Sequence, residues 1–273
     1  MMDLIELKNI AIKAAHSAGA IIRTYYNNDV AVEYKEGGES YASQVVTEVD
    51  KKCEAAIISH LLPSCKALDI ALLTEETEDD GSRFIKDFFW CVDPMDGTLS
   101  FINKQPGFAV SIALVDKDGT PHLGVVYDPS TGLLYHAVKG IGAFKNGQPA
   151  DIKRSNNYLS YITDRKLNET PSGKDIASFL DKKVKGLNLN GRSEISGAGA
   201  VMNAIRVLEH GPACMLKLPK KENGGGSIWD YAATACIYHE LGLQATNIEG
   251  GRLDLNRKDG TYMNHEGVYF ANL

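Results

Sequence analysis

One short segment of the chain combines residue types that could bind both a cation and a phosphate group. Two carboxylates, Asp93 and Asp96, lie three residues apart at the end of an apolar stretch. Carboxylates held close together in a folded chain are neutralised by protonation or by hard metal ions, which prefer oxygen ligands. The Gly97-Thr98 pair that follows could begin a helix whose free N–H groups bind phosphate oxygens. Taken alone, the segment could also be an ordinary strand-to-turn junction, where Asp, Pro and Gly are common.

Three more acidic residues occur where an apolar run ends or a helix begins. Glu75 follows the run Ala71-Leu72-Leu73-Thr74, Asp50 stands at the start of a helical pattern, and Asp230 precedes a second one. Singly, Glu75 could belong to a solvated acidic loop, and Asp230 could be a first-turn acid that the helix dipole stabilises. The complete set is more informative than any one of its members.

As a set, these residues resemble the inositol monophosphatase superfamily. These are magnesium-dependent, lithium-sensitive phosphatases that include inositol monophosphatases, fructose-1,6-bisphosphatases and 3′(2′),5′-bisphosphate nucleotidases. Their first signature, Asp-Pro-apolar-Asp-Gly-Thr-x-x-Phe, matches residues 93–101, and their second matches Trp229-Asp230-Tyr231-Ala232-Ala233 with Leu241-Gly242. The resemblance covers nearly the whole chain. An aspartyl-nucleophile phosphatase would instead need Asp-x-Asp-x-Thr, which this segment lacks.

The resemblance implies a site that holds two or three Mg²⁺ ions. Glu75, Asp93 and the backbone carbonyl of Met95 would hold one ion, while Asp93, Asp96 and Asp230 would hold another. Such an arrangement suits phosphoryl transfer to water, because the ions attract the phosphate and stabilise the leaving oxygen.

The resemblance also assigns roles to the residues around the attacking water. Glu75 and Thr98 would orient this water. Asp50 would accept a hydrogen bond from Thr98 and so raise the ability of Thr98 to accept a proton. The backbone amides of Gly97 and Thr98 would hold phosphate oxygens. The catalytic residues implied are therefore Asp50, Glu75 and Thr98.

The substrate is only partly readable from the sequence. In this family the leaving group contacts the segment that corresponds here to Ser196 and Gly197, and the strand that ends near Lys217. The sequence Leu216-Lys217-Leu218-Pro219 is similar to that of some bisphosphate nucleotidases, and a cation there would suit a second phosphate. The leading expectation is hydrolysis of adenosine 3′,5′-bisphosphate. The alternatives are an inositol-1-monophosphatase or other sugar-phosphate phosphatase, with Lys217 a solvated charge, and, more remotely, a non-catalytic metal- or nucleotide-binding regulator.

The elements that must position these residues follow from the apolar periodicity. Helical spacing begins at Leu7, behind a capping pair of Asp3 and Glu6, and a second helical pattern is expected to end at Pro63. An antiparallel meander is expected between Ala109 and Phe144, followed by alternating strands and helices. The fold class expected is α/β (α+β), and the resemblance implies a layered α/β/α/β/α sandwich. A change of composition suggests an N-terminal α+β part, residues 1–155, and a C-terminal α/β part, residues 156–273.

Composition excludes several other functions. The 273 residues carry 29 Lys+Arg and 35 Asp+Glu, a formal net charge of −6, which argues against DNA or RNA duplexes as partners and favours a small-molecule phosphate ester. No stretch approaches 18 uncharged apolar residues, so a cytoplasmic protein without membrane association is expected. The five cysteines form no Cys-x-x-Cys pair and are expected to be buried thiols. Family members often dimerise, so a homodimer is a candidate assembly.

Overall fold

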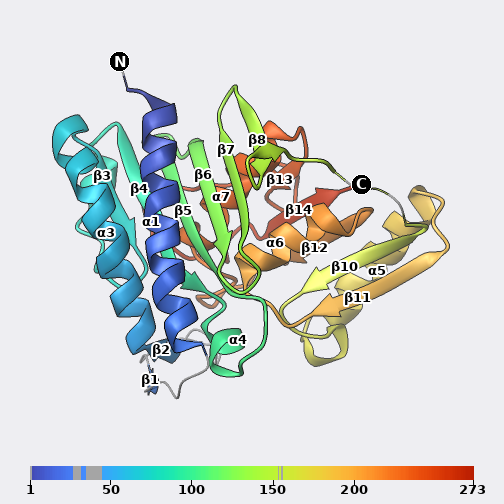
Figure 1. The fold of residues 1–273 in the computed structure, drawn as a ribbon. Coiled ribbons are helices and arrows are strands. Elements are labelled where there is room, and N and C mark those ends of the chain that lie inside the picture. The colour runs from blue at the N-terminus through green and yellow to red at the C-terminus, as the bar shows by residue number, and fades with distance from the viewer. Residues whose placement is uncertain (1, 27–31, 35–44, 153, 155) are drawn as a thin grey trace.

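The computed structural model describes residues 2–26, 32–34, 45–152, 154 and 156–273. Two large sheets dominate the fold, with helices on both sides of each (Figure 1). The first sheet has seven strands, which follow one another in space as they do along the chain: β3 (Ala71–Thr74), β4 (Phe88–Asp96), β5 (Ala109–Asp116), β6 (Pro121–Asp128), β7 (Leu133–Val138), β8 (Gly142–Lys145) and β9 (Gln148–Pro149).

Strands β4 to β9 pair antiparallel with their neighbours, whereas β3 runs parallel to β4. The predicted meander is therefore confirmed. The parallel pair matters for the site, because parallel strands end at the same edge of a sheet and so bring the residues after β3 next to the end of β4.

The second sheet has five strands in the spatial order β11 (Gly191–Ser196), β10 (Tyr158–Thr163), β12 (Ala213–Lys217), β14 (Val268–Asn272) and β13 (Gln244–Thr246). Strand β10 is parallel to both β11 and β12, and β14 is antiparallel to β12 and β13. Strand β14, the last in the chain, thus lies inside the sheet, between β12 and β13.

Helices form three layers around these sheets. One pair, α1 and α3, packs on one face of the first sheet, another pair, α6 and α7, lies between the two sheets, and α5 covers the outer face of the second sheet. The α/β/α/β/α sandwich is confirmed. The helical elements and the remaining ladder are α1 (Leu4–Tyr25), α3 (Glu48–Leu68), α4 (Thr98–Ile102), α5 (Gly173–Gly186), α6 (Ala200–Glu209), α7 (Ile228–Glu240), the short 3₁₀ helices Ser82–Phe84 and Leu167–Glu169, and β1 (Val32–Tyr34) paired with β2 (Val45–Thr47).

Helix α7 can lie flat on the first sheet because its residues there are small. Ala232, Ala233 and Ala235 are buried, and a Cβ added to Gly124 of β6 would lie 2.3 Å from the carbonyl oxygen of Ala233. Only glycine allows so close an approach of the two backbones. This contact fixes where the first turn of α7, which carries Asp230, meets the end of the sheet.

The expected end of the second helix at Pro63 is wrong, because α3 continues to Leu68. Pro63 faces solvent, while Leu61, Ser64 and Cys65 keep the buried face of the helix in contact with the core. Ser64 Oγ accepts a hydrogen bond from Trp90 Nε1 at 3.0 Å. Pro63 removes one backbone hydrogen bond from the helix. The packing of its neighbours against the core offsets the free-energy cost of that loss.

Other local expectations are confirmed. Asp3 caps α1 by accepting hydrogen bonds from the amides of Ile5 and Glu6, and all five cysteines are buried free thiols. Among the described residues, no helix combines the length and the apolar character needed to cross a bilayer. The division of the chain near residue 155 stays a prediction.

Candidate active site

Strand β4 presents both of its aspartates to one site because it contains a bulge. In a regular strand, residues three apart point to opposite faces. Here Asp93 pairs with Ser111 but Asp96 pairs with Ala109, so β4 has one residue more than β5 over this stretch. Pro94, which lacks an N–H, stands inside the bulge, and the amide of Met95 donates to Asp93 Oδ1 at 3.0 Å. The irregularity re-aims Asp96 toward Asp93.

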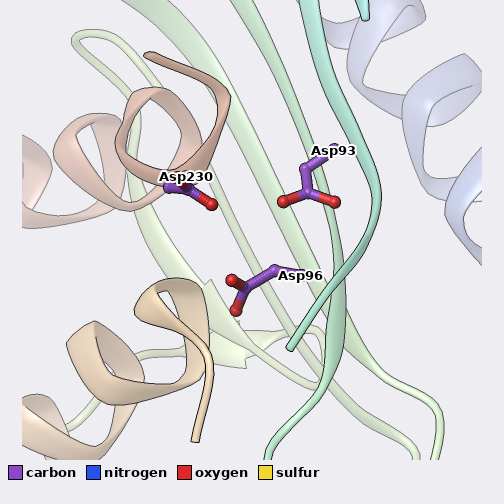
Figure 2. Close-up of side chains that lie close together, drawn as sticks. All are labelled: Asp93, Asp96 and Asp230. Carbon is purple, nitrogen blue, oxygen red and sulfur yellow. The ribbon is translucent and has the colours of Figure 1, made fainter. Parts of the chain in front are cut away.

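Asp230 reaches the same place from the first turn of α7. It forms a capping box with Ser227: each residue accepts a hydrogen bond from the backbone amide of the other. Figure 2 shows the carboxylates of Asp230, Asp93 and Asp96 around one common space. One carboxylate oxygen from each lies within 4.8 Å of the other two.

The electrostatics of this cluster call for a cation. Burial, together with the charges of neighbouring acids, raises the pKa of Asp93 and of Asp96 well above 3.8. Burial also raises the pKa of Asp230, although the Ser227 amide and Lys217 act in the opposite direction. A carboxylate with a raised pKa is one whose negative charge is poorly stabilised. Three oxygen donors at this spacing fit a hard divalent ion, which would restore charge balance.

Two further acids from the sequence prediction lie near Asp93. The Glu75 amide donates to the Val92 carbonyl at 3.2 Å, which continues the β3–β4 pairing and places Glu75 beside Asp93. Asp50 is buried in the first turn of α3. Both charges act on Asp93 and raise its pKa, after burial, the largest cause. The structure therefore brings Asp50, Glu75, Asp96 and Asp230 together around Asp93.

The turn after β4 leads directly into a short helix, as the sequence predicts. Gly97 has a φ of 83° and precedes α4, which Thr98 begins. Thr98 Oγ1 donates to the carbonyl oxygen of Met95 at 3.2 Å. The hydroxyl thus faces the carbonyl that the sequence predicts as a metal ligand, whereas the predicted Asp50–Thr98 hydrogen bond stays a prediction.

The segment that contains Ser196 and Gly197 lies against this turn. Ser100 Oγ donates to the Gly197 carbonyl at 3.3 Å, and the Gly199 amide donates to the Gly107 carbonyl at 2.9 Å. Ser196 ends β11 immediately before this segment. The predicted phosphate-binding and leaving-group segments therefore meet, although they come from different sheets.

Asp96 also connects the first sheet to helix α6. Its two oxygens accept hydrogen bonds from the amides of Ala200, at 3.0 Å, and Val201, at 2.9 Å. These amides begin α6, so the positive end of the helix dipole faces a carboxylate of the cluster and partly offsets its raised pKa. A Cβ added to Gly199 would lie 2.2 Å from Asp96 Oδ2.

Replacing Gly199 by alanine is expected to displace Asp96 and break both of these hydrogen bonds. The backbone conformation of Gly199 suits alanine, so the effect comes from the collision, and we expect a loss of about 1–3 kcal/mol of stability together with most of the activity. Denaturant unfolding and phosphate release measure the two effects. Gly186→Ala is the control, because nothing lies within 4 Å of a Cβ there; equal behaviour of the two variants would contradict the argument.

Lys217 lies where the sequence predicts a cation, and it has a partner that the sequence analysis missed. Its Nζ is 3.2 Å from Asp164 Oδ2. The pKa of Lys217 is raised. Burial alone would lower it, but the neighbouring Asp164, Tyr231 and Asp230 have the larger effect together. Lys217 in turn lowers the pKa of Asp164. Asp164 directly follows β10, so the rule that singled out acids at strand ends could have found it.

The layered fold and the buried acidic site beside a Gly-Thr turn are the features of metal-dependent phosphatases. The model of the Inositol monophosphatase family matches residues 3–271. An Inositol monophosphatase 2 of Solanum lycopersicum is 31% identical over 261 residues, which are 93% of this chain and 91% of that protein. The chain belongs to the inositol monophosphatase family, whose members are hydrolases of phosphate monoesters and generally depend on Mg²⁺.

Two further similarities bear on the substrate. An Inositol-1-monophosphatase of Bacillus subtilis is 27% identical over 259 residues, covering 92% of this chain and 88% of that protein. The crystal structure of CysQ from Bacteroides thetaiotaomicron, a bacterial member of the family, is similar with a TM-score of 0.73 and 25% identity, covering 97% of each chain. Inositol phosphatases and a CysQ protein are thus both among the relatives.

Proposed function

We propose that the protein is a Mg²⁺-dependent phosphatase that removes the 3′-phosphate from adenosine 3′,5′-bisphosphate or a close relative. The observation that carries this choice of substrate is Lys217, an ammonium group held beside the acidic cluster by Asp164 and in the field of Asp230. A cation that feels the charge of Asp230 suits a second phosphate on the leaving group.

Glu75, Asp93, the carbonyl of Met95, Asp96 and Asp230 are the residues that would hold two or three Mg²⁺ ions. When bound, Mg²⁺ supplies positive charge that attracts the phosphate ester and stabilises the charge that develops as the ester bond breaks. The carboxylates supply charge balance for the ions, and the capping box fixes Asp230 through Ser227.

Glu75 and Thr98 orient a water molecule for attack on phosphorus, and Asp50 supports Thr98. The water oxygen forms the new bond to phosphorus, the bond from phosphorus to the ester oxygen breaks, and the leaving oxygen takes up a proton from solvent water. Thr98, whose ability to accept a proton is raised by Asp50, takes the proton that the water loses. The amides of Gly97 and Thr98 hold phosphate oxygens, and Ser196, Gly197 and Lys217 contact the leaving group.

An inositol or sugar monophosphatase is the second candidate, and Asp164 favours it. Paired with Lys217, this carboxylate offers an acceptor beside a donor, a combination that suits neighbouring hydroxyl groups as well as a phosphate. Phosphate release from adenosine 3′,5′-bisphosphate and from inositol 1-phosphate, measured side by side with Mg²⁺, without it and with added Li⁺, separates the two. A preference for inositol 1-phosphate would overturn the nucleotide assignment.

Reversing the charge of Lys217 tests its role directly. Lys217→Glu is expected to raise KM for the bisphosphate by about tenfold to a hundredfold, because a charge-assisted contact becomes a repulsive one, and to affect inositol 1-phosphate far less. Steady-state kinetics on both substrates measure the difference. Lys185→Glu, on the exposed face of α5, is the control. An equal loss with both substrates would count against a phosphate-selecting role.

A cytoplasmic location, a homodimer and the absence of nucleic-acid duplexes among the partners are part of the same proposal. The location and the partners are inferred from the composition, and the dimer from the frequent dimerisation of family members. Sedimentation of the purified protein tests the dimer.

A further inference from the structure

A buried glutamate on α3 holds the loop that carries Glu75. Glu54 lies one helical turn after Asp50, on the same side of α3, and only 9% of its surface is exposed. Its Oε1 accepts a hydrogen bond from the hydroxyl of Thr74, and its Oε2 accepts one from Thr77 Oγ1 at 3.1 Å. Each oxygen of the carboxylate therefore binds one threonine.

The two threonines stand on either side of Glu75 in the chain. Thr74 is the last residue of β3 and is buried, whereas Thr77 lies in the exposed part of the loop. Between them, the Glu75 amide is bound to the Val92 carbonyl of β4. The backbone around Glu75 is thus fixed to the sheet at one point and to α3 at two.

We propose that Glu54 is a positioning residue, whose bonds to Thr74 and Thr77 hold Glu75 in the orientation that binds a divalent cation. This inference rests on the proposed role of Glu75 as a metal ligand. Both oxygens of Glu54 are already engaged by hydroxyl groups, so Glu54 acts through the loop. Groups that orient a ligand from behind commonly change metal affinity by about 10- to 100-fold when they are replaced.

The geometry explains why the loop needs such a residue. Glu75 lies near Asp93, and their like charges repel each other. The loop beyond it is rich in acids and partly exposed. Without Glu54, the free loop could turn Glu75 toward solvent, and a cation would have to draw it back at a cost in affinity.

Mg²⁺ binding measured by titration calorimetry tests the proposal, with the Mg²⁺ concentration for half-maximal activity and kcat at saturating Mg²⁺ as second readouts. Glu54→Gln is expected to raise the Kd for Mg²⁺ by about tenfold and to recover most of its kcat at saturating Mg²⁺. Asp128→Asn is the matched control: Asp128 is buried and accepts hydroxyl bonds from Ser130 and Thr131, but it lies on β6. It is expected to lose stability without a change in Kd.

Substitutions of Thr77 test the same proposal if the Glu54→Gln variant does not fold. Its side chain is exposed, so Thr77→Val keeps the shape and removes one of the two bonds, whereas Thr77→Ser keeps the hydroxyl. The valine variant is expected to bind Mg²⁺ several-fold more weakly than the serine variant. Equal affinities in the two variants, or a lowered kcat in Glu54→Gln with an unchanged Kd, would overturn the inference.

Glu75→Gln separates this inference from the proposed function. If Glu75→Gln leaves Mg²⁺ binding unchanged, then Glu75 is not a ligand and the proposed site is wrong. If Glu75→Gln weakens binding but the Glu54 and Thr77 variants do not, then the site stands and the positioning role of Glu54 is wrong.

Discussion

Replacing Asp93 by asparagine is expected to abolish Mg²⁺-dependent phosphate release. Asp93 is 1% exposed and lies at the centre of the acidic cluster, so the change removes the one carboxylate that both proposed metal positions share. Metal ions supply several kcal/mol of transition-state stabilisation, which corresponds to a loss of about a thousandfold or more in kcat/KM. Phosphate release across a Mg²⁺ titration measures the effect.

The same substitution is expected to stabilise the metal-free protein, which distinguishes loss of the site from loss of the fold. Asparagine fills nearly the same space, and it removes a buried charge that its neighbours repel. Denaturant unfolding in the presence of a chelator checks this. The exposed Asp175→Asn on α5 is the control. Near-normal turnover in Asp93→Asn would show that the catalytic metal is held elsewhere.

The metal-free protein is expected to become more stable as the pH falls from the raised pKa values of its acidic cluster toward 3.8. Burial and the neighbouring charges raise the pKa values of Asp93 and Asp96 in the folded state above the value of 3.8 expected when unfolded. Between these pKa values the folded state binds more protons than the unfolded state, so the free energy of unfolding falls as the pH rises. Each extra proton contributes a slope of about 1.4 kcal/mol per pH unit.

Unfolding free energies at several pH values, with a chelator or with saturating Mg²⁺, measure this dependence. Mg²⁺ holds the carboxylates in their charged form, so it is expected to stabilise the protein most at the higher pH and to remove the slope. Burial lowers the pKa values of His136 and His239, so these groups act in the opposite direction at low pH. Because Asp93→Asn keeps both histidines, the difference between its slope and that of the native chain reports the contribution of Asp93. Equal slopes in that variant and the native chain would refute the assignment.

The parts of the fold that the sequence predicts are those with apolar periodicity. Strands β5 to β7 are nearly continuous buried runs, and their turns contain Gly, Asp and Pro. No apolar pattern predicts strand β11, because its sequence, Gly-Arg-Ser-Glu-Ile-Ser, has a single large apolar residue. It is an edge strand that only its pairing with β10 reveals.

The site residues divide in a similar way. Asp93, Asp96 and Asp230 could be predicted because their spacing forms signatures, and the structure brings their oxygens together. Glu54 carries no signature, although its position four residues after Asp50 on one helix face was a usable signal. Buried Arg83 donates a hydrogen bond to Asn256, which lies far from it in the chain. No local sequence pattern predicts such a contact.

The origin of the cluster from two distant parts of the chain affects how the protein folds. Glu75, Asp93 and Asp96 come together when β3 and β4 pair, but Asp230 arrives only when α7 docks onto the first sheet. This docking closes a long loop and moves one more negative charge toward three others, so it is both entropically slow and electrostatically opposed. A divalent cation bound by the first three carboxylates would reduce this repulsion, so we expect Mg²⁺ to speed refolding.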